Sequence, residues 1–476
     1  MTDKLYFSRD TKVFLEPIDP SNGSAQGRIY EVPVLEGYQF SQATNTSEVT
    51  LNEMSTTGGE TRRGRRMFND SYAPAEWSFQ TYIRPFLSGG ADSNTNGSVY
   101  AVEEALWGAM IGDGDYVAAN ASTGAVTAID NPSVPTTDTD LTEQTVSGIS
   151  TSTDGDGRNA QLDVTVNDSG VISVALNASN KGSGYTDDDK LFISAEDLAD
   201  ALGESLSDID SDLEVQVNGI TASSVSKFTG FNTRDASELE FDFQDSNKAA
   251  LGTFNLYFVI GSANAEATKQ VYKITGCVVN EAAIDFDIEG LATINWSGFG
   301  ELISENENST ITATNTEGTT ATSNFIRNRL TSLALSNGST NYGLVLTGGN
   351  ITISNNITFI TPETMGVVNQ PVGHVTGTRN IGGNFTCYLN GKDDGSAELF
   401  ETIAEATDSI INSHNAVFSI GGSNAPLLKV TMPTTHLEIP THSIEDIISL
   451  DVNFHALPST IDGKNECSLQ YKGKAL

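Results

Sequence analysis

The chain has 476 residues and a mass of 50.5 kDa, which is enough for about three domains of ordinary size. It carries 25 Lys and Arg residues against 62 Asp and Glu residues, a formal net charge of −37. Nucleic-acid binding needs clustered cations, so this charge disfavours a general DNA or RNA binder, and it disfavours an anionic membrane surface for the same reason. Hydrophobic residues make up 38% of the chain, enough for β-rich cores with a highly solvated exterior.

Cysteine usage and the start of the chain indicate a protein made in a reducing cytoplasm. Three cysteines, Cys277, Cys387 and Cys467, form no C-x-x-C pair and are too few for a disulfide framework. The first residues, MTDKLYFSRDTKVF, contain no apolar run, so we expect no signal peptide. No stretch reaches about 18 apolar residues, so we expect no membrane-spanning segment.

Two-residue alternation dominates the chain and predicts strands with one buried face. In EWSFQTYIRPF the buried face is expected to carry Trp77, Phe79, Thr81 and Ile83. In SLDVNFHAL it is expected to carry Leu450, Val452, Phe454 and Ala456. The segments FNLYFVIG, YKITGCVV, VTMP and HLEIPT read as further strands.

Helical spacing is rare, and it predicts one amphipathic helix in each half of the chain. VYAVEEALWGAM places apolar residues on one stripe, and SAELFETIAEAT does the same, with Ser396 as a candidate N-cap. The predicted stripes are Val102, Ala105, Leu106, Ala109 and Met110 in the first helix and Leu399, Ile403 and Ala406 in the second.

Five collinear blocks indicate an internal repeat. VLEGYQFSQATN parallels VLTGGNITISNN, with Leu35 on Leu346, Gly37 on Gly348, Phe40 on Ile351 and Asn45 on Asn356. SFQTYI parallels NFTCYL, with Phe79 on Phe385, Tyr82 on Tyr388 and Ile83 on Leu389, and the helices follow in the same order. FNLYFVIGSANA parallels HNAVFSIGGSNA, with Asn255 on Asn415, Phe258 on Phe418, Ile260 on Ile420, Gly261 on Gly421 and Asn264 on Asn424. ATINWSG parallels SLDVNFHA, with Ile294 on Val452, Asn295 on Asn453 and Trp296 on Phe454.

The repeat predicts a mainly β fold of two tandem β-sandwich or barrel domains, each with one flanking helix. The first domain comprises residues 1–140 and 222–303, and the second comprises residues 325–476. Residues 141–221 form an inserted, β-rich accessory domain, because a DSG turn joins alternating strands there and the surrounding stretch is strongly acidic. Residues 304–324 have almost no apolar side chains and are expected to form a flexible linker.

The sequence gives little support to a catalytic or metal site. No H-E-x-x-H, G-x-S-x-G, phosphate loop or dinucleotide fingerprint appears, so we expect no enzyme, no cofactor and no metal. The five histidines, His374, His414, His436, His442 and His455, all lie in the second copy. Calcium stays open as an alternative to solvated turn acids, with the acids falling into three clusters: Asp154 and Asp156; Asp187, Asp188 and Asp189; and Asp208, Asp210 and Asp212.

The sharpest local anomaly is basic. GETRRGRRMF holds four of the twelve arginines of the chain, Arg62, Arg63, Arg65 and Arg66, in a Gly/Thr-rich loop between two predicted strands. In an acidic protein such a loop favours contact with the acidic surface of another copy. Contact with DNA and a simple solvated loop are the alternatives.

These features resemble the tail tube protein of long-tailed bacteriophages. The resemblance rests on the strand, long loop, strand, helix, strand, strand order. It also rests on the runs GYQFSQATNTSEVTLNE, AEWSFQTYIRPF and FSIGGSNAPLLKVTMPTTHLEIPTHSIEDIISLDVNFHAL. The acidic module, with GRNAQLDVTV and NKGSGYTDDDKLFIS, is similar to a β-rich accessory module of marine phage structural proteins.

The resemblance implies a structural virion protein that self-assembles into stacked rings around a channel for the phage genome. The implied partners are other copies of the chain, passing DNA held without specific binding, and other tail proteins such as terminator, tape measure, baseplate or tip proteins. Two fused tube domains predict rings of three chains with pseudo-sixfold symmetry, with six chains as the alternative. A β-repeat adhesin that binds a host glycan is the competing function, and a carbohydrate-active enzyme is a third.

Overall fold

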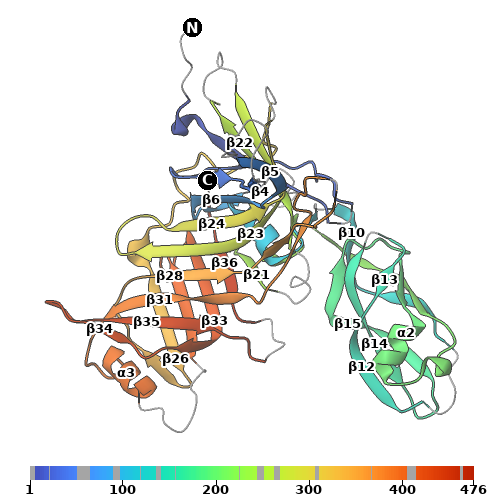
Figure 1. Ribbon diagram of the computed structural model, residues 1–476. Coiled ribbons are helices and arrows are strands. Elements are labelled where there is room, and N and C mark those ends of the chain that lie inside the picture. The colour runs from blue at the N-terminus through green and yellow to red at the C-terminus, as the bar shows by residue number, and fades with distance from the viewer. Residues whose placement is uncertain are drawn as a thin grey trace, which may run out of the picture. The chain divides into compact units, whose positions relative to one another are not determined.

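The computed structural model (Figure 1) describes most of the chain in two compact units. The main unit comprises residues 1–91, 96–116 and 228–476, and the inserted unit comprises residues 92–95 and 117–227. The described residues are 6–20, 22–50, 65–88, 97–117, 120–135, 141–155, 157–223, 226–243, 251–261, 269–305, 310–365, 367–404, 414–460 and 465–475. Both units are built mainly from antiparallel strands, which confirms the predicted fold class. Within the described residues no helix is both long and apolar enough to cross a membrane.

The first half of the main unit is a run of seven hydrogen-bonded strands. Each strand is antiparallel to its neighbours, and the run does not follow the order of the sequence. The spatial order is β2 (Tyr30–Val32), β1 (Lys12–Pro17), β22 (Phe254–Ile260), β23 (Gln270–Asp287), β24 (Thr293–Gly300), β6 (Ala75–Tyr82) and β3 (Gln39–Ser41).

The second half repeats this order strand for strand. The equivalent run is β27 (Thr340–Tyr342), β26 (Ser332–Asn337), β32 (His414–Ile420), β33 (Leu427–Leu437), β35 (Ser449–Ala456), β31 (Asn380–Tyr388) and β28 (Leu346–Ser354). The two runs are joined edge to edge, because β23 of the first half pairs with β28 of the second. Figure 1 shows β28, β31 and β35 side by side beneath β23 and β24.

The strand pairing corrects one block of the repeat by two residues. We expected Ile294 to correspond to Val452, but β24 and β35 have matching burial when Thr293 corresponds to Ser449. The ladders agree with this shift: Ile294 pairs with Thr81 in β6, and Leu450 pairs with Cys387 in β31. The asparagines Asn295 and Asn453 suggest the other match, but they are not equivalent in the fold, because Asn295 pairs with Gln80 whereas Asn453 pairs with Asn384.

Shorter strands complete the main unit. Two hairpins, β4 (Thr44–Thr50) with β5 (Arg65–Tyr72) and β29 (Thr358–Ile360) with β30 (Gly373–Val375), extend from equivalent places in the two halves. The remaining strands are β7 (Pro85–Ser88), β8 (Ser98–Ala101), β9 (Tyr116–Val117), β19 (Lys227–Phe228), β20 (Phe231–Arg234), β21 (Leu239–Asp242), β25 (Ile303–Glu305), β34 (Thr441–Ser443), β36 (Ser468–Lys472) and β37 (Lys474–Ala475).

Both predicted helices are present, but the first is not amphipathic. Every residue of α1 (Glu104–Ile111) is buried, because strands of the core surround it and Trp107 packs edge to face against Trp296. In α3 (Ser396–Ala404) the predicted N-cap Ser396 is instead the first helical residue. Its hydroxyl donates to the Tyr388 carbonyl at 2.9 Å and ties the helix to the end of β31.

The strand faces predicted from alternation are confirmed. Trp77, Phe79, Thr81 and Ile83 are all buried, as are Leu450, Val452, Phe454 and Ala456. One continuous core includes residues from both halves of the main unit. The aliphatic and aromatic side chains buried there provide the hydrophobic driving force that holds the two runs of strands together.

The expected flexible linker is wrong for its described part. Residues 310–324 pack on the first half, where the Ile29 amide donates to Thr314 Oγ1 at 2.7 Å. Arg84 Nη2 donates to the Ala321 carbonyl at 2.7 Å, and the buried Asn324 side chain donates to the Gly318 carbonyl at 3.1 Å. Polar side chains here hydrogen-bond to the fold, so their low hydrophobicity was a poor guide to mobility.

The inserted unit has its own core and begins earlier than the expected residue 141. Its strands are β10 (Asn120–Val126), β11 (Ile129–Ser133), β12 (Gln144–Ser150), β13 (Ser152–Thr153), β14 (Arg158–Val166), β15 (Ile172–Ser183), β16 (Lys190–Ile193), β17 (Leu213–Val217) and β18 (Ile220–Ser223). It also contains a helix that the sequence reasoning missed, α2 (Ala195–Leu202), capped by Ser194. Leu162, Val164, Val215 and Val217 are fully buried in its core.

Candidate assembly surfaces

The arginine-rich hairpin exposes both charge and apolar surface. Arg65 and Arg66 begin β5 and are exposed, and Arg65 Nη1 lies 3.4 Å from Glu48 Oε2. Met67 and Phe68 follow on the same strand and are more than half exposed. Arg62 and Arg63 lie outside the described residues. The described part of this site is therefore a solvent-facing strand rather than a structureless loop.

The hairpin of the second half lies beside it. The Tyr72 amide donates to the Asn369 carbonyl at 2.9 Å, and the Asn369 amide donates to the Asp70 carbonyl at 3.1 Å. This second hairpin and its loop expose a series of apolar side chains: Ile360, Met365, Val367, Val368, Val372 and Val375. The described parts of the two hairpins therefore expose Arg65 and Arg66 together with a series of apolar side chains.

A turn that exposes both acidic and apolar side chains lies at the opposite end of the strands that follow the hairpins. β31 starts at Asn380, soon after the β29–β30 hairpin, and ends at Tyr388, which pairs with Ser449. At about 3.3 Å per residue, these ends are about 25 Å apart. The turn 444–448 exposes Ile444 and Ile447 beside Glu445 and Asp446, next to a hollow of about 710 Å³. Figure 1 shows β34 and α3 at this end.

Several strands of the main unit pair through one edge only within the described residues, and β3 and β34 are two of them. β3 pairs with β6 through one edge only. β34 pairs with β35 through one edge only, and it continues the line of β33 beyond the end of β32. A free edge presents backbone donors and acceptors to another chain.

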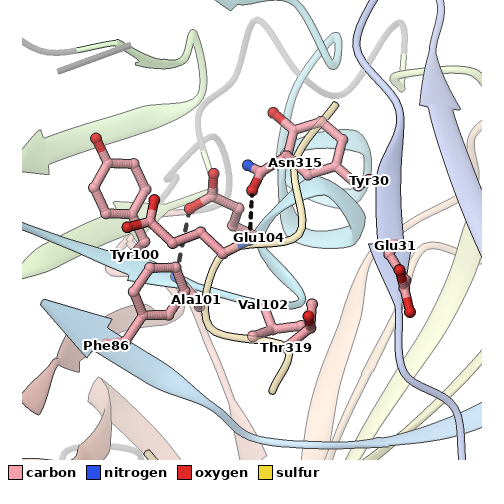
Figure 2. Close-up of a pocket in the computed structure, with 10 residues that line it drawn as sticks. Tyr30, Glu31, Phe86, Tyr100, Ala101, Val102, Glu104, Asn315 and Thr319 are labelled. Atoms are coloured by element: carbon pink, nitrogen blue, oxygen red, sulfur yellow. Dashed lines mark hydrogen bonds between the residues drawn. The ribbon is translucent and has the colours of Figure 1, made fainter. Parts of the chain in front are cut away.

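A buried charged cluster lies between β8, α1 and the packed segment 310–324. Glu104 Oε2 and Arg234 Nη2 are 3.0 Å apart, and both side chains are almost completely buried. Figure 2 shows Glu104 with Tyr30, Tyr100 and Asn315 around a polar cavity of about 10 Å³. That volume holds about one water molecule and no organic ligand. The cluster is therefore part of the packing of the main unit and not a substrate pocket.

Glu103, which directly precedes Glu104 in the sequence, is also fully buried. Burial raises the pKa of its carboxyl group from 4.5 to about 7, although the Tyr471 hydroxyl and the Arg84 amide donate to it. The Tyr471 hydroxyl in turn accepts a hydrogen bond from Trp107 Nε1 at 2.7 Å. A raised carboxyl pKa is a feature of some catalytic acids, but here the carboxyl group lies in packed core.

The candidate metal ligands do not converge within the described residues: no group of three or more His, Cys, Asp or Glu side chains there could hold a metal ion. The carboxylates considered for calcium instead accept hydrogen bonds in turns, Asp154 from the Lys190 amide and Asp212 from the Ala195 amide. Asp156 lies outside the described residues. His414 is buried, and desolvation lowers the pKa of its imidazole.

The comparisons with known proteins show a similarity to a phage tail protein. No protein-family profile matches the chain. The chain is 25% identical over 480 aligned residues to the tail tube protein pb6 of Escherichia phage T5. The alignment covers 99% of this chain and 76% of that protein. It therefore includes both halves of the main unit and the inserted unit.

Proposed function

We propose that this chain, a bacteriophage tail tube protein by its similarity over nearly its whole length, forms rings of three chains. These rings stack into the tube through which the genome leaves the virion. Its place is the phage tail, and its role there is structural. The glycan-binding adhesin has no support from the comparison.

The observation that carries the ring proposal is the seam between the two halves. Both halves have the same order of seven strands, and β23 of one pairs with β28 of the other over seven residues. Two equivalent domains joined side by side are two neighbours of a ring. Three such chains give six similar positions, with true threefold and approximate sixfold symmetry.

Fusion of two neighbours also favours closure of the ring. One of every two domain interfaces becomes intramolecular, which raises the effective concentration of the domains. The packed segment 310–324 fits this arrangement, because it holds the connection between the halves against the first half and leaves little slack.

The two ends of the strands support head-to-tail stacking. One end exposes Arg65 and Arg66 beside apolar residues, and the other exposes Glu445 and Asp446 beside Ile447. Stacking brings these unlike surfaces together, and such a heterologous contact repeats without limit along an axis. We assign the inter-ring contact to the arginine hairpin, Arg62, Arg63, Arg65 and Arg66, and its receiving surface to this acidic turn.

The charge of the chain suits a conduit for DNA. Phosphate contacts need Lys and Arg, and 62 acidic residues against 25 basic ones leave few for a channel wall. DNA would then slide past without being held. Other tail proteins, such as the terminator and tip proteins, would bind the two different ends of the tube.

Negative-stain microscopy of the purified protein tests the assembly. We expect rings or hollow tubes with a uniform bore. Single particles at every concentration and salt condition tried would contradict the proposed function.

A further inference from the structure

We infer that each chain joins the next through a second seam, in which the free edge of β3 takes the β34 stretch of a neighbouring copy. This inference rests on the proposed ring and goes beyond it by naming the strands and their register. The seam inside the chain, β23 with β28, supplies the template for the seam between chains.

The strand ladders align the first half with the second at both ends of the segment that would form the seam. Val279 pairs with Gly298 as Leu437 pairs with Phe454. Asp285 pairs with Thr293 as Ser443 pairs with Ser449. Both matches give the same correspondence, so residues 281–287 of the first half occupy the position of residues 439–445 in the second.

The partner strand corresponds just as directly. Phe40 of β3 pairs with Trp77 of β6, and Ile351 of β28 pairs with Gly383 of β31. Inside the chain Ile351 lies opposite Ile284, Asn350 opposite Asp285 and Gly349 opposite Phe286. Between chains this register places Phe40 opposite His442, Gln39 opposite Ser443 and Tyr38 opposite Ile444.

Side-chain exposure distinguishes the occupied seam from the open one. Phe286 is 2% exposed in the seam within the chain, whereas its counterpart Ile444 is 80% exposed. Ile284 and Ile351 are fully buried, whereas His442 is exposed and Phe40 only partly buried. A neighbouring chain in this register would cover these side chains as β28 covers those of β23.

The edge of β3 is already ordered to receive a partner. Tyr38 stacks on Phe258 with ring centres 5.6 Å apart, and its hydroxyl lies 2.8 Å from Thr11 Oγ1. Phe40 also stacks on Phe258, with ring centres 4.5 Å apart. On the opposite edge His442 packs edge to face on Phe400 of α3 at 5.0 Å. Little side-chain entropy remains to be lost when the edges meet.

One position of the open seam departs from the template. Pro440 stands where the first half has Ala282, and proline has no amide hydrogen for a ladder. We therefore place the pairing between chains over Thr441–Ile444 rather than over all seven residues. A shorter ladder is consistent with rings that assemble from separate chains.

Disulfide trapping tests the register. Gln39→Cys with Ser443→Cys places two thiols directly opposite each other in neighbouring chains, where cross-strand Cβ atoms are about 4.5–5.5 Å apart. Oxidation of assembled rings should give covalent dimers and trimers on a denaturing gel. The matched control, Ser41→Cys with Ser443→Cys, is displaced by two residues and should give at least tenfold less. The three native cysteines are buried.

A substitution tests the seam without added thiols. Ile444→Lys changes a side chain that is exposed in the single chain, so folding should be retained while three-chain rings are lost to single chains. Val171→Lys, at an exposed site of the inserted unit, should leave rings intact. Suppose that three-chain rings form, but that no disulfide cross-link appears and Ile444→Lys has no effect. This result would overturn the seam and leave the proposed function standing. The unmodified protein failing to form rings or tubes would overturn both.

Discussion

At the scale of single residues, Glu103 couples the main unit to pH. Folding raises the pKa of its carboxyl group from 4.5 to about 7, so the folded state binds a proton that the unfolded state releases. The stability that this proton confers is complete below about pH 4.5. It is lost as the pH rises through 7.

We therefore expect Glu103→Gln to be more stable than the unmodified chain at pH 8, by about 3 kcal/mol at one pKa unit per 1.36 kcal/mol. The difference should shrink toward zero at pH 4.5, because the carboxyl group is then protonated as well. Urea unfolding of the unassembled protein at both pH values measures this. An equal difference at both would show that the carboxyl group does not titrate in this range.

The arginine hairpin gives the second prediction at this scale. Reversing Arg62, Arg63, Arg65 and Arg66 to Glu should leave rings intact but shorten or abolish tubes, because the acidic turn of the next ring would then repel them. Tube lengths in electron micrographs give the answer, and tubes of the unmodified protein should also shorten at high salt.

The control for this prediction makes the same change of charge as a rescuing variant, but at a site away from the proposed contact. The reversal makes the chain more acidic by eight charges. The acidic-turn variant Glu445→Lys with Asp446→Lys should restore stacking when it is mixed with the reversed chain, because its lysines then face the new glutamates. Glu196→Lys with Asp200→Lys, on the exposed face of α2, should restore nothing. Tubes of normal length from the reversed chain would contradict the assignment.

At the scale of elements, the strands were the most predictable part of the fold. Alternation in Trp77–Ile83 and in Leu450–Ala456 reflects one buried face, and the structure buries each predicted side chain. Helix α1 was predicted in place, but its surroundings were not, because a fully enclosed helix has no polar face to reveal them. Helix α2 carried a sequence signal, Ser194 three residues before Asp197. The Ser194 hydroxyl accepts a hydrogen bond from the Asp197 amide and so caps the N-terminus of the helix.

The assembly surfaces were harder to predict from the sequence. The arginine cluster is conspicuous, but the partnerless strand edges are not, because a free edge and a paired one have the same side-chain pattern. Ile444 becomes informative only after the ladders set it against the buried Phe286. Packing of residues 310–324 was missed because it depends on hydrogen bonds from distant residues such as Arg84 and Ile29.

The inserted unit gives the prediction at this scale. It has its own core, so replacing residues 118–226 with a short Gly/Ser bridge between β9 and β19 should leave the tube domains folded. We expect tubes of the same bore and smaller outer diameter, because an acidic module of this bulk in the channel would obstruct DNA. Density for the module inside the bore in tubes of the complete chain would refute this placement.

At the scale of the whole molecule, the proposed ring depends on two fused and equivalent halves. In the proposed ring, their common strand order and the shared seam β23–β28 give each half one position. Only the first half carries the inserted unit and the arginine hairpin, so the six positions alternate. The outer surface should therefore show three projections per ring.

The most direct test of this account is the rotational symmetry of tube cross-sections, with the mass of a single ring as its check. We expect a mass of three chains, true threefold symmetry and an approximate sixfold repeat near the bore. A ring of six chains with true sixfold symmetry would contradict this expectation, because the second half of each chain would then not occupy a ring position.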